Sequence, residues 1–272
     1  MNYLKELLAT RELLVNLTMR EVKGQYRRTV FGQLWSLLNP IATMLVYTVV
    51  FSVIFRARPD EGDPSGLDIY PLWLMCGLLP WLYFSRVING GLTTMVTSSN
   101  LIKKVYFPRV HLPLSVMLSV GFTWLIEMGV LVAALWIFGA FPLPWIPVAL
   151  LFMALLALMA VGFSMMFAIL NVHFRDTQHF VTIILQMWMY LTPIIYPVSL
   201  VADVAAERGS WILTVYQLNP MERFVQVFRN LLYDNRFPEL ADTLYCLGAA
   251  GLVFTLGFLV FAKNEKRLAE LL

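Results

Sequence analysis

Basic residues near the start of the chain have the chemistry needed to hold phosphate groups. Ahead of the first long apolar run, four cationic side chains cluster: Arg20, Lys23, Arg27 and Arg28. At 100° per residue, Val15, Met19, Val22 and Tyr26 share one helical face, and Arg20, Lys23 and Arg27 share a neighbouring one. Such a helix can lie on a membrane with its apolar side in the acyl region and its basic side against phosphate head groups. A simpler interpretation stays open, in which these cations only anchor this end of the chain inside the cell.

A second group of residues combines cations with aromatic rings in the stretch NLIKKVYFPRV, residues 100 to 110. Pro108 is expected to end any helix formed by residues 101–107, because the residue before a proline resists helical geometry. If Tyr106 and Phe107 are exposed beside Lys103, Lys104 and Arg109, the composition is typical of a surface that docks another protein. The alternative is topological, with the lysines holding the loop inside and the rings at the membrane interface.

Other reactive residue types give little indication of catalysis. No G-x-x-x-x-G-K-[ST] phosphate loop is present, so the chain does not bind and hydrolyse ATP by that route. Cys76 and Cys246 fall in apolar runs, where packing is expected rather than a disulfide. No metal site is predicted, because the histidines lack ligand spacing with cysteines or acids. Those histidines are His111, His173 and His179.

The elements that must position these residues are membrane helices. The chain has 272 residues, of which 59% are hydrophobic and 14% are charged, and this is too apolar for an ordinary soluble domain. Crossing a hydrocarbon core of about 30 Å takes about 20 apolar residues in a helix. Six spans are predicted: residues 34–55, 70–97, 113–138, 146–171, 179–200 and 243–262. We therefore expect an all-α membrane protein with six transmembrane helices.

The distribution of positive charge predicts the orientation. An even number of spans puts both termini on one side, and a cytoplasmic N-terminus places most of the twenty basic residues inside: Lys5, Arg11, Arg20, Lys23, Arg27, Arg28, Lys103, Lys104, Arg109, Arg175, Lys263, Lys266 and Arg267. This agrees with the positive-inside rule. The net charge of +3 then reflects membrane orientation, and nucleic acid is not an expected partner. Residues 1–33 form the interface segment, 34–262 the transmembrane domain and 263–272 a cytoplasmic tail.

Residues 201–242 are expected to form structure on the outer side. Asn219 can cap a helix that begins at Pro220. Apolar residues then follow helical spacing, while a polar set faces the other way: Glu222, Arg223, Gln226 and Arg229. These short helices either re-enter the outer leaflet, where neighbouring protein must shield them, or form a plain extracellular cap.

Two ionisable residues lie inside predicted spans. Arg86 and Glu127 fall at similar depths, and intramembrane charges are usually paired or face water. We predict a structural salt bridge between the two spans in preference to a substrate contact. Helix breaks are expected at four prolines: Pro40, Pro80, Pro193 and Pro197.

The order of several motifs resembles a known family. These motifs are EVKGQYRRTVFGQLWSLLNP, GLLPWLYFS, NLIKKVYFPR, NVHFRD, YLTPIIYP and QLNPMERFVQVFR. The pattern covers nearly the whole chain and resembles the membrane subunits of polysaccharide-exporting ABC transporters of the ABC-2 type. That resemblance implies a homodimer of this chain in the bacterial cytoplasmic membrane, with two separate ATPase subunits that hold ATP and Mg²⁺. It implies export of an undecaprenyl diphosphate-linked polymer such as O-antigen, capsule or wall teichoic acid.

The same resemblance assigns roles to residues. Residues 100–108 are similar to a coupling helix that sits in a cleft of the ATPase, with the NVHFRD loop as a second contact. The implied contact residues are Lys103, Lys104, Tyr106, Phe107, Arg109, Arg175 and Asp176. The substrate diphosphate is expected at Arg20, Lys23, Arg27 and Arg28. Aromatic residues of spans one and five would line a channel at the dimer interface, although interface belts and ordinary packing also use such residues. The candidates are Trp35, Tyr47, Phe51, Trp188, Tyr190 and Tyr196.

Other classes of function remain as alternatives. An ion-gradient-driven secondary transporter needs coupling acids near the midplane, for which Glu127 alone is weak support, and no internal repeat is recognised. A membrane transferase needs clustered acids, whereas the inside loops offer Asp176 beside Arg175. Export of a drug or small lipid by the same scaffold also stays open. We predict that this chain is a permease and has no enzymatic activity itself.

Overall fold

The computed structural model describes residues 10–25, 29–54, 56 and 61–271, and all regular secondary structure in these ranges is helical. In chain order the elements are α2 Arg11–Gln25, η1 Gly32–Leu34, α3 Trp35–Tyr47, η2 Thr48–Ile54, α4 Tyr70–Thr97, α5 Ser99–Lys104, α6 His111–Ile137, η3 Leu143–Trp145, α7 Ile146–His173, α8 Thr177–Leu191, α9 Val198–Arg208, α10 Trp211–Gln217, α11 Pro220–Phe228, η4 Arg229–Asp234 and α12 Leu240–Leu271.

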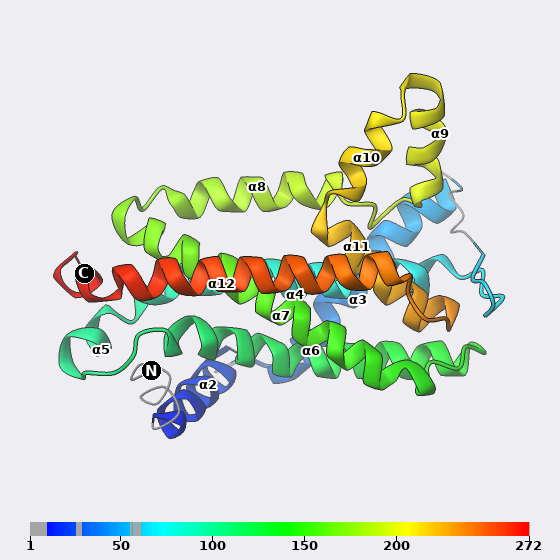
Figure 1. Ribbon diagram of the computed structural model, residues 1–272. Helices are drawn as coiled ribbons and strands as arrows, with labels where there is room; N and C mark the ends of the chain where they lie inside the picture. The colour runs from blue at the N-terminus through cyan, green and yellow to red at the C-terminus, as the bar shows by residue number, and fades with distance from the viewer. Residues whose placement is uncertain (1–9, 26–28, 55, 57–60, 272) are drawn as a thin grey trace.

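The long helices α4, α6, α7, α8 and α12 run side by side along one axis (Figure 1). The short helix α5 and the C-terminal end of α12 lie at one end of this bundle, and α9 and α10 lie at the other. Helix α2 packs across the flank of α6 near the α5 end (Figure 1). The residues expected inside the cell therefore gather at one end of the bundle, and those expected outside at the other.

Within the described part of the chain, five segments are long and apolar enough to cross a membrane: Trp35–Ile54, Tyr70–Thr97, His111–Ile137, Leu143–His173 and Leu240–Glu265. They match five of the six predicted spans. The predicted span 179–200 is not a single helix, because α8 has 15 residues and ends at Leu191, before the break predicted at Pro193. At 1.5 Å per residue α8 is about 22 Å long, shorter than a hydrocarbon core of about 30 Å. A membrane span over residues 179–200 therefore stays a prediction.

Helix α4 is the most buried of the five candidate spans, and the span that begins with α3 is the least buried. In the most apolar 18-residue window of each span, 78% of the residues are buried in α4 but 6% in the span that begins with α3. Pro80 lies inside α4 and Pro40 inside α3, and both helices continue past them, so the predicted breaks at these two prolines are wrong. Neighbouring helices make prolines tolerable in membrane helices. The break near Pro193 is confirmed.

Helices α7 and α12 approach closely because both carry glycine at their contact. A Cβ atom added to Gly162 of α7 would lie 2.6 Å from the carbonyl oxygen of Val253 in α12. Gly257 of α12 in turn faces the backbone of Gly162. Small residues of this kind let membrane helices pack by direct backbone contact, which replaces the hydrophobic drive that lipid does not supply.

The start of α11 confirms one prediction and corrects another. The Asn219 side chain accepts a hydrogen bond of 3.0 Å from the backbone N–H of Met221, so Asn219 is the N-cap. The polar set, predicted on the face opposite the apolar residues, does not form a solvent-exposed face, since Glu222 and Arg229 are only 5% and 3% exposed. Helix α11 packs against α4, α7 and α12, and these neighbours cover its polar side as well.

Candidate functional site

The loop between α4 and α6 is an exposed basic and aromatic element anchored on the core. Helix α5 ends at Lys104, earlier than the predicted limit at residue 107, because Val105 adopts an extended conformation. Lys103 and Lys104 are exposed, and Tyr106 is 86% exposed. Phe107 was expected at the surface, and this is wrong: it is 5% exposed and packs in the hydrophobic cluster at this end of the bundle. Phe107 therefore anchors the loop.

Polar contacts tie the end of this loop to the two chain termini. The backbone N–H of Arg109 donates to Oε1 of Glu265 in α12 over 2.8 Å, and the Arg109 guanidinium donates to the Glu265 carbonyl oxygen. His111 lies 2.9 Å through Nδ1 from the carbonyl oxygen of Pro108 and 3.1 Å through Nε2 from the Thr10 hydroxyl. The structure thus directs Arg109 toward α12, where it helps to fix the position of the loop.

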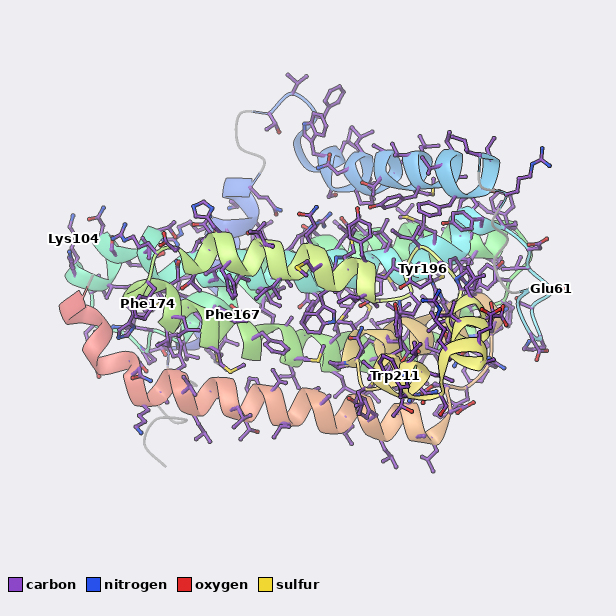
Figure 2. All side chains as sticks on the ribbon, turned by 90° about the horizontal axis from the view of Figure 1, so that it is seen from above. Glu61, Lys104, Phe167, Phe174, Tyr196 and Trp211 are labelled. Atoms are coloured by element: carbon purple, nitrogen blue, oxygen red, sulfur yellow. The ribbon has the colours of Figure 1, made fainter. Side chains whose placement is uncertain are left out.

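A second loop, between α7 and α8, lies at the same end of the bundle. Figure 2 shows Phe174 of this loop and Lys104 at that end. Phe174 is 69% exposed, and Arg175 and Asp176 are exposed as well. Together the two loops present cationic, acidic and aromatic side chains on one surface, as expected for a contact with another protein.

Helix α2 carries the exposed cations Arg20 and Lys23. Arg20 forms an ion pair of 2.9 Å with Glu21. Arg27 and Arg28, the other two residues of the predicted phosphate-binding set, lie outside the described residues. The side of α2 that packs on the bundle is centred on Leu17, which is 4% exposed, and Val15 and Met19 on the predicted apolar face remain 59% and 46% exposed.

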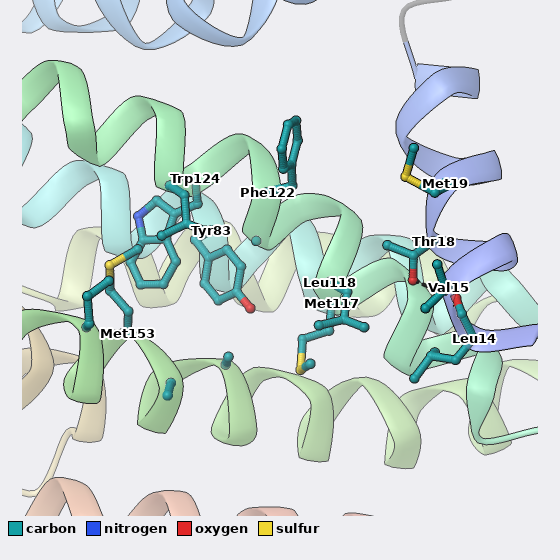
Figure 3. A pocket seen from close by; sticks show the side chains of 15 residues that line it. Leu14, Val15, Thr18, Met19, Tyr83, Met117, Leu118, Phe122, Trp124 and Met153 are labelled. Carbon is teal, nitrogen blue, oxygen red and sulfur yellow. Dashed lines mark hydrogen bonds between the residues drawn. The ribbon is translucent and has the colours of Figure 1, made fainter. Parts of the chain in front are cut away.

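Val15 and Met19 border an apolar groove of about 510 Å³ between α2, α6 and α7. Figure 3 shows these two side chains opposite Leu118 and Phe122 of α6. The far end of the groove is closed by Trp124 and Tyr83, whose rings stack with centroids 4.1 Å apart. Because the lining is apolar, the groove suits a hydrocarbon ligand.

On the other side of α6 lies a polar cavity of about 730 Å³, between α2, α4 and α6. Its lining includes Arg86, together with Glu21 near the end of α2. Arg86 donates through Nη1 to Oε1 of Glu127 over 2.7 Å, so the predicted intramembrane salt bridge is present. This cavity was not predicted, although the sequence carries a signal for it in the polar residues at every fourth position of α4: Ser85, Asn89, Thr93 and Thr97.

The predicted channel aromatics divide into packed and exposed residues. Trp188 is half-buried among Trp81, Phe84 and Phe163, with ring centroids 5.3–6.1 Å away, and its Nε1–H donates to Asn219 over 2.8 Å. Three others are likewise half-buried and joined to neighbours: Tyr47, Phe51 and Tyr196. Trp35 and Tyr190 are 38% and 53% exposed. The structure brings these aromatics to α3, η2 and α8 but does not test whether they line a channel.

A buried arginine near the outer end of the bundle was missed as a structural centre. The guanidinium of Arg229 lies 3.5 Å from the ring centroid of Trp73 in α4. It donates to the carbonyl oxygens of Pro193 and Ile194, each over 2.8 Å. These carbonyls follow the end of α8 and lie where the helical hydrogen-bond ladder stops. Arg229 therefore fixes the break between α8 and α9 against α4.

The chain belongs to the ABC-2 type transporter family, whose sequence model matches residues 12–233. Among curated proteins it is similar to the O-antigen export system permease protein RfbA of Myxococcus xanthus, with 32% identity over 92% of this chain and 90% of that protein. It is also similar to RfbA of Klebsiella pneumoniae, with 31% identity over 96% and 95%. The polysialic acid transport protein KpsM of Escherichia coli is 20% identical over 92% of each chain.

Proposed function

We propose that this chain is the permease subunit of an ATP-driven exporter. Its cargo is a lipid diphosphate-linked cell-surface polysaccharide of the O-antigen class. The permease acts in the bacterial cytoplasmic membrane with both termini inside. The named relatives support the polysaccharide class, because each match extends over at least nine-tenths of both chains. Wall teichoic acid is a less supported cargo, since none of these relatives carries that name.

The observation that carries the proposal is the surface formed by the two loops at the α5 end. Exposed Lys103, Lys104 and Tyr106 lie there with Arg175 and Asp176, on a base fixed by Phe107. Membership of the family supports a separate ATPase subunit as the partner of this surface. ATP and Mg²⁺ are then held by that partner, and the permease contributes no catalytic residue.

A second copy of this chain is the proposed partner within the membrane. The span that begins with α3 buries 6% of its most apolar window, and Leu45, Val46 and Val53 are each at least 55% exposed. Pairing of two copies through α3 would place Trp35, Tyr47 and Phe51 near the partner, and Tyr190 and Tyr196 from α8 and its following loop beside them. Arg20 and Lys23 on α2 would hold the substrate diphosphate, to which arginine offers paired N–H donors.

Depletion of the protein in its own host tests the cargo. We expect surface polysaccharide to fall while lipid-linked polymer accumulates on the cytoplasmic face. Chemical identification of the accumulated material distinguishes a polysaccharide from teichoic acid, a small lipid or a drug. Transport by the purified chain alone in nucleotide-free vesicles would show a secondary transporter and refute the proposal.

Charge reversal tests the ATPase contact. Lys104→Glu combined with Tyr106→Ala should reduce co-purification of the ATPase subunit, whereas Lys263→Glu changes an exposed lysine of α12 and serves as the control. Both variants should insert into the membrane normally, because the substituted side chains are outside the hydrophobic clusters. Unchanged co-purification of the double variant would remove the assignment of this surface.

A further inference from the structure

The polar cavity between α2, α4 and α6 has an unusual wall for a space inside a membrane domain. Its principal surface is a stripe of four polar residues on one side of α4, which we term the α4 polar stripe: Ser85, Asn89, Thr93 and Thr97. The opposite wall includes Ser119 of α6, and Gly24 and Gln25 of α2 lie at its border. Polar side chains at membrane depth usually mark a pathway for substrate, ions or water.

The hydrogen bonds of the stripe determine what its free atoms can do. The hydroxyls of Ser85, Thr93 and Thr97 donate to carbonyl oxygens of their own helix, over 3.2, 3.0 and 3.2 Å. Asn89 uses one amide hydrogen in the same way, on the carbonyl oxygen of Ser85. A hydroxyl has one hydrogen and two acceptor lone pairs, so each bonded hydroxyl keeps acceptor capacity. The stripe is therefore an acceptor-rich surface that suits a ligand with many donors.

The charges around the cavity are balanced. The Arg86 guanidinium is paired with the carboxylate of Glu127, which is 2% exposed. At the border, Glu21 is paired with Arg20. A bare anion would meet no uncompensated cation among these residues. Arg86 has five N–H groups, of which one is bonded to Glu127, so it still offers donors to a neutral acceptor.

We propose that this cavity binds uncharged sugar residues of the exported polymer next to its lipid anchor. Sugar hydroxyls donate to the α4 polar stripe and accept from Arg86, and the paired charges give no advantage to phosphate. The volume of about 730 Å³ lies within the ordinary range of ligand sites, roughly 300–1,000 Å³. The diphosphate stays outside the cavity on α2, at Lys23 and at Arg20, whose ion pair with Glu21 is solvent-exposed and weak enough to be exchanged for phosphate. This inference rests on the proposed function and adds to it a site for the sugar part of the substrate.

The two native cysteines make a labelling test possible, since Cys76 and Cys246 are both buried. Thr93→Cys places a thiol in the cavity, and Thr243→Cys places one on a partly exposed position of α12, outside the cavity. Each variant, assembled with its ATPase subunit, is labelled with N-ethylmaleimide in inside-out vesicles. The vesicles come from cells that make the lipid-linked polymer and from cells that lack its synthesis. We expect labelling at residue 93 to be slower when polymer is present, and labelling at residue 243 to be unchanged.

Export by near-isosteric variants provides a second measurement. Thr93→Val removes one acceptor oxygen, and Thr243→Val removes a hydroxyl that likewise donates to a carbonyl oxygen of its own helix. We expect the amount of surface polymer to fall about two- to tenfold for the first variant, which corresponds to the free energy of one hydrogen bond, and to stay constant for the second. ATPase assembly should be normal in both.

The outcomes separate the site from the proposed function. If depletion of the unmodified protein leaves surface polymer unchanged, the proposed function fails whatever the cavity binds. If export is normal but residue 93 is labelled equally with and without polymer, or is unreactive in both, the sugar site alone is refuted. Equal protection of residue 243 would also refute it, because the effect would then not belong to the cavity.

Discussion

Replacement of Arg229 should destabilise the protein more than replacement of any exposed arginine. In Arg229→Met the carbonyl oxygens of Pro193 and Ile194 lose their donors while the surrounding residues stay buried. An unsatisfied buried carbonyl costs about 1–3 kcal/mol, and a desolvated cation–π contact such as that on Trp73 contributes about 2 kcal/mol. Relief of the cation's own desolvation penalty offsets several kcal/mol of this loss. We expect a net destabilisation of about 2–4 kcal/mol.

Thermal unfolding of the purified protein in detergent measures this effect. At about 2–4 °C per kcal/mol for a chain of this size, the expected fall in the melting temperature is roughly 5–15 °C. Arg229→Lys keeps the charge but lacks the forked geometry that reaches two carbonyls. Its fall in melting temperature should therefore be intermediate. Arg208→Met, on the exposed side of α9, is the matched control and should lie within about 2 °C of the unmodified protein.

Amide hydrogen exchange gives a local check. The segment 192–197 should exchange faster in Arg229→Met, because this break between α8 and α9 is held by the arginine. A melting temperature equal to that of Arg208→Met, with unchanged exchange at the break, would refute the role assigned to Arg229. A large fall in melting temperature with unchanged local exchange would show that the side chain stabilises another part of the bundle.

Three further predictions follow from the same structure. Arg86→Met and Glu127→Gln should each lower the melting temperature. The double variant should lose less stability than the two single variants lose together, which a double-mutant cycle measures. Strictly additive losses would exclude a coupled pair. Burial raises the pKa of Glu222 to about 7 from its ordinary value of 4.5, although Arg223 acts in the opposite direction. The fold therefore favours the neutral acid, and stability that is present below pH 4.5 is lost as the pH rises through 7. Glu222→Gln should be more stable than the unmodified protein at pH 8 by up to about 3 kcal/mol and similar at pH 4.5, in thermal unfolding at both pH values; equal pH dependence of the two proteins would contradict this. Gly257→Val should separate α7 from α12 and reduce the yield of folded protein, whereas Gly251→Val, where open space surrounds the glycine, should not; equal yields would contradict the close contact.

Hydropathy predicted most of the fold because membrane helices satisfy their backbone hydrogen bonds internally. Five spans need only length and composition to be recognised. The span predicted over 179–200 is divided near Pro193, as that proline predicted, although the apolar pattern continues past it. Pro80 shows the opposite case, since the same residue type lies within an unbroken α4. Whether a proline ends a helix depends on what neighbouring helices offer the freed carbonyls, and this information is not local.

Residue roles were harder to predict than spans. Exposed Lys104 and Tyr106 agree with the sequence, whereas Phe107, Glu222 and Arg229 are buried on sides that appeared polar or free. Helical periodicity gives the relative angle of side chains but not which helix covers each angle. Arg86 and Glu127 could be paired in advance because two charges at equal membrane depth have few other ways to avoid the cost of burial.

Helix α4 connects the features that the proposed transport cycle needs. Its N-terminal half carries Trp73, which packs on Arg229, and its C-terminal half carries the α4 polar stripe and leads through Ser98 into α5. Helix α4 is continuous from Tyr70 to Thr97, so we expect it to carry a displacement of α5 by an ATPase subunit as one body, without a hinge at Pro80. We therefore expect the sugar site and the outer break near Pro193 to move together with α5. Distances from spin labels at α5 and at α9 to a common reference label on α12, with and without ATP, test this. Both distances should change, and a change at α5 alone would show that another helix carries the displacement.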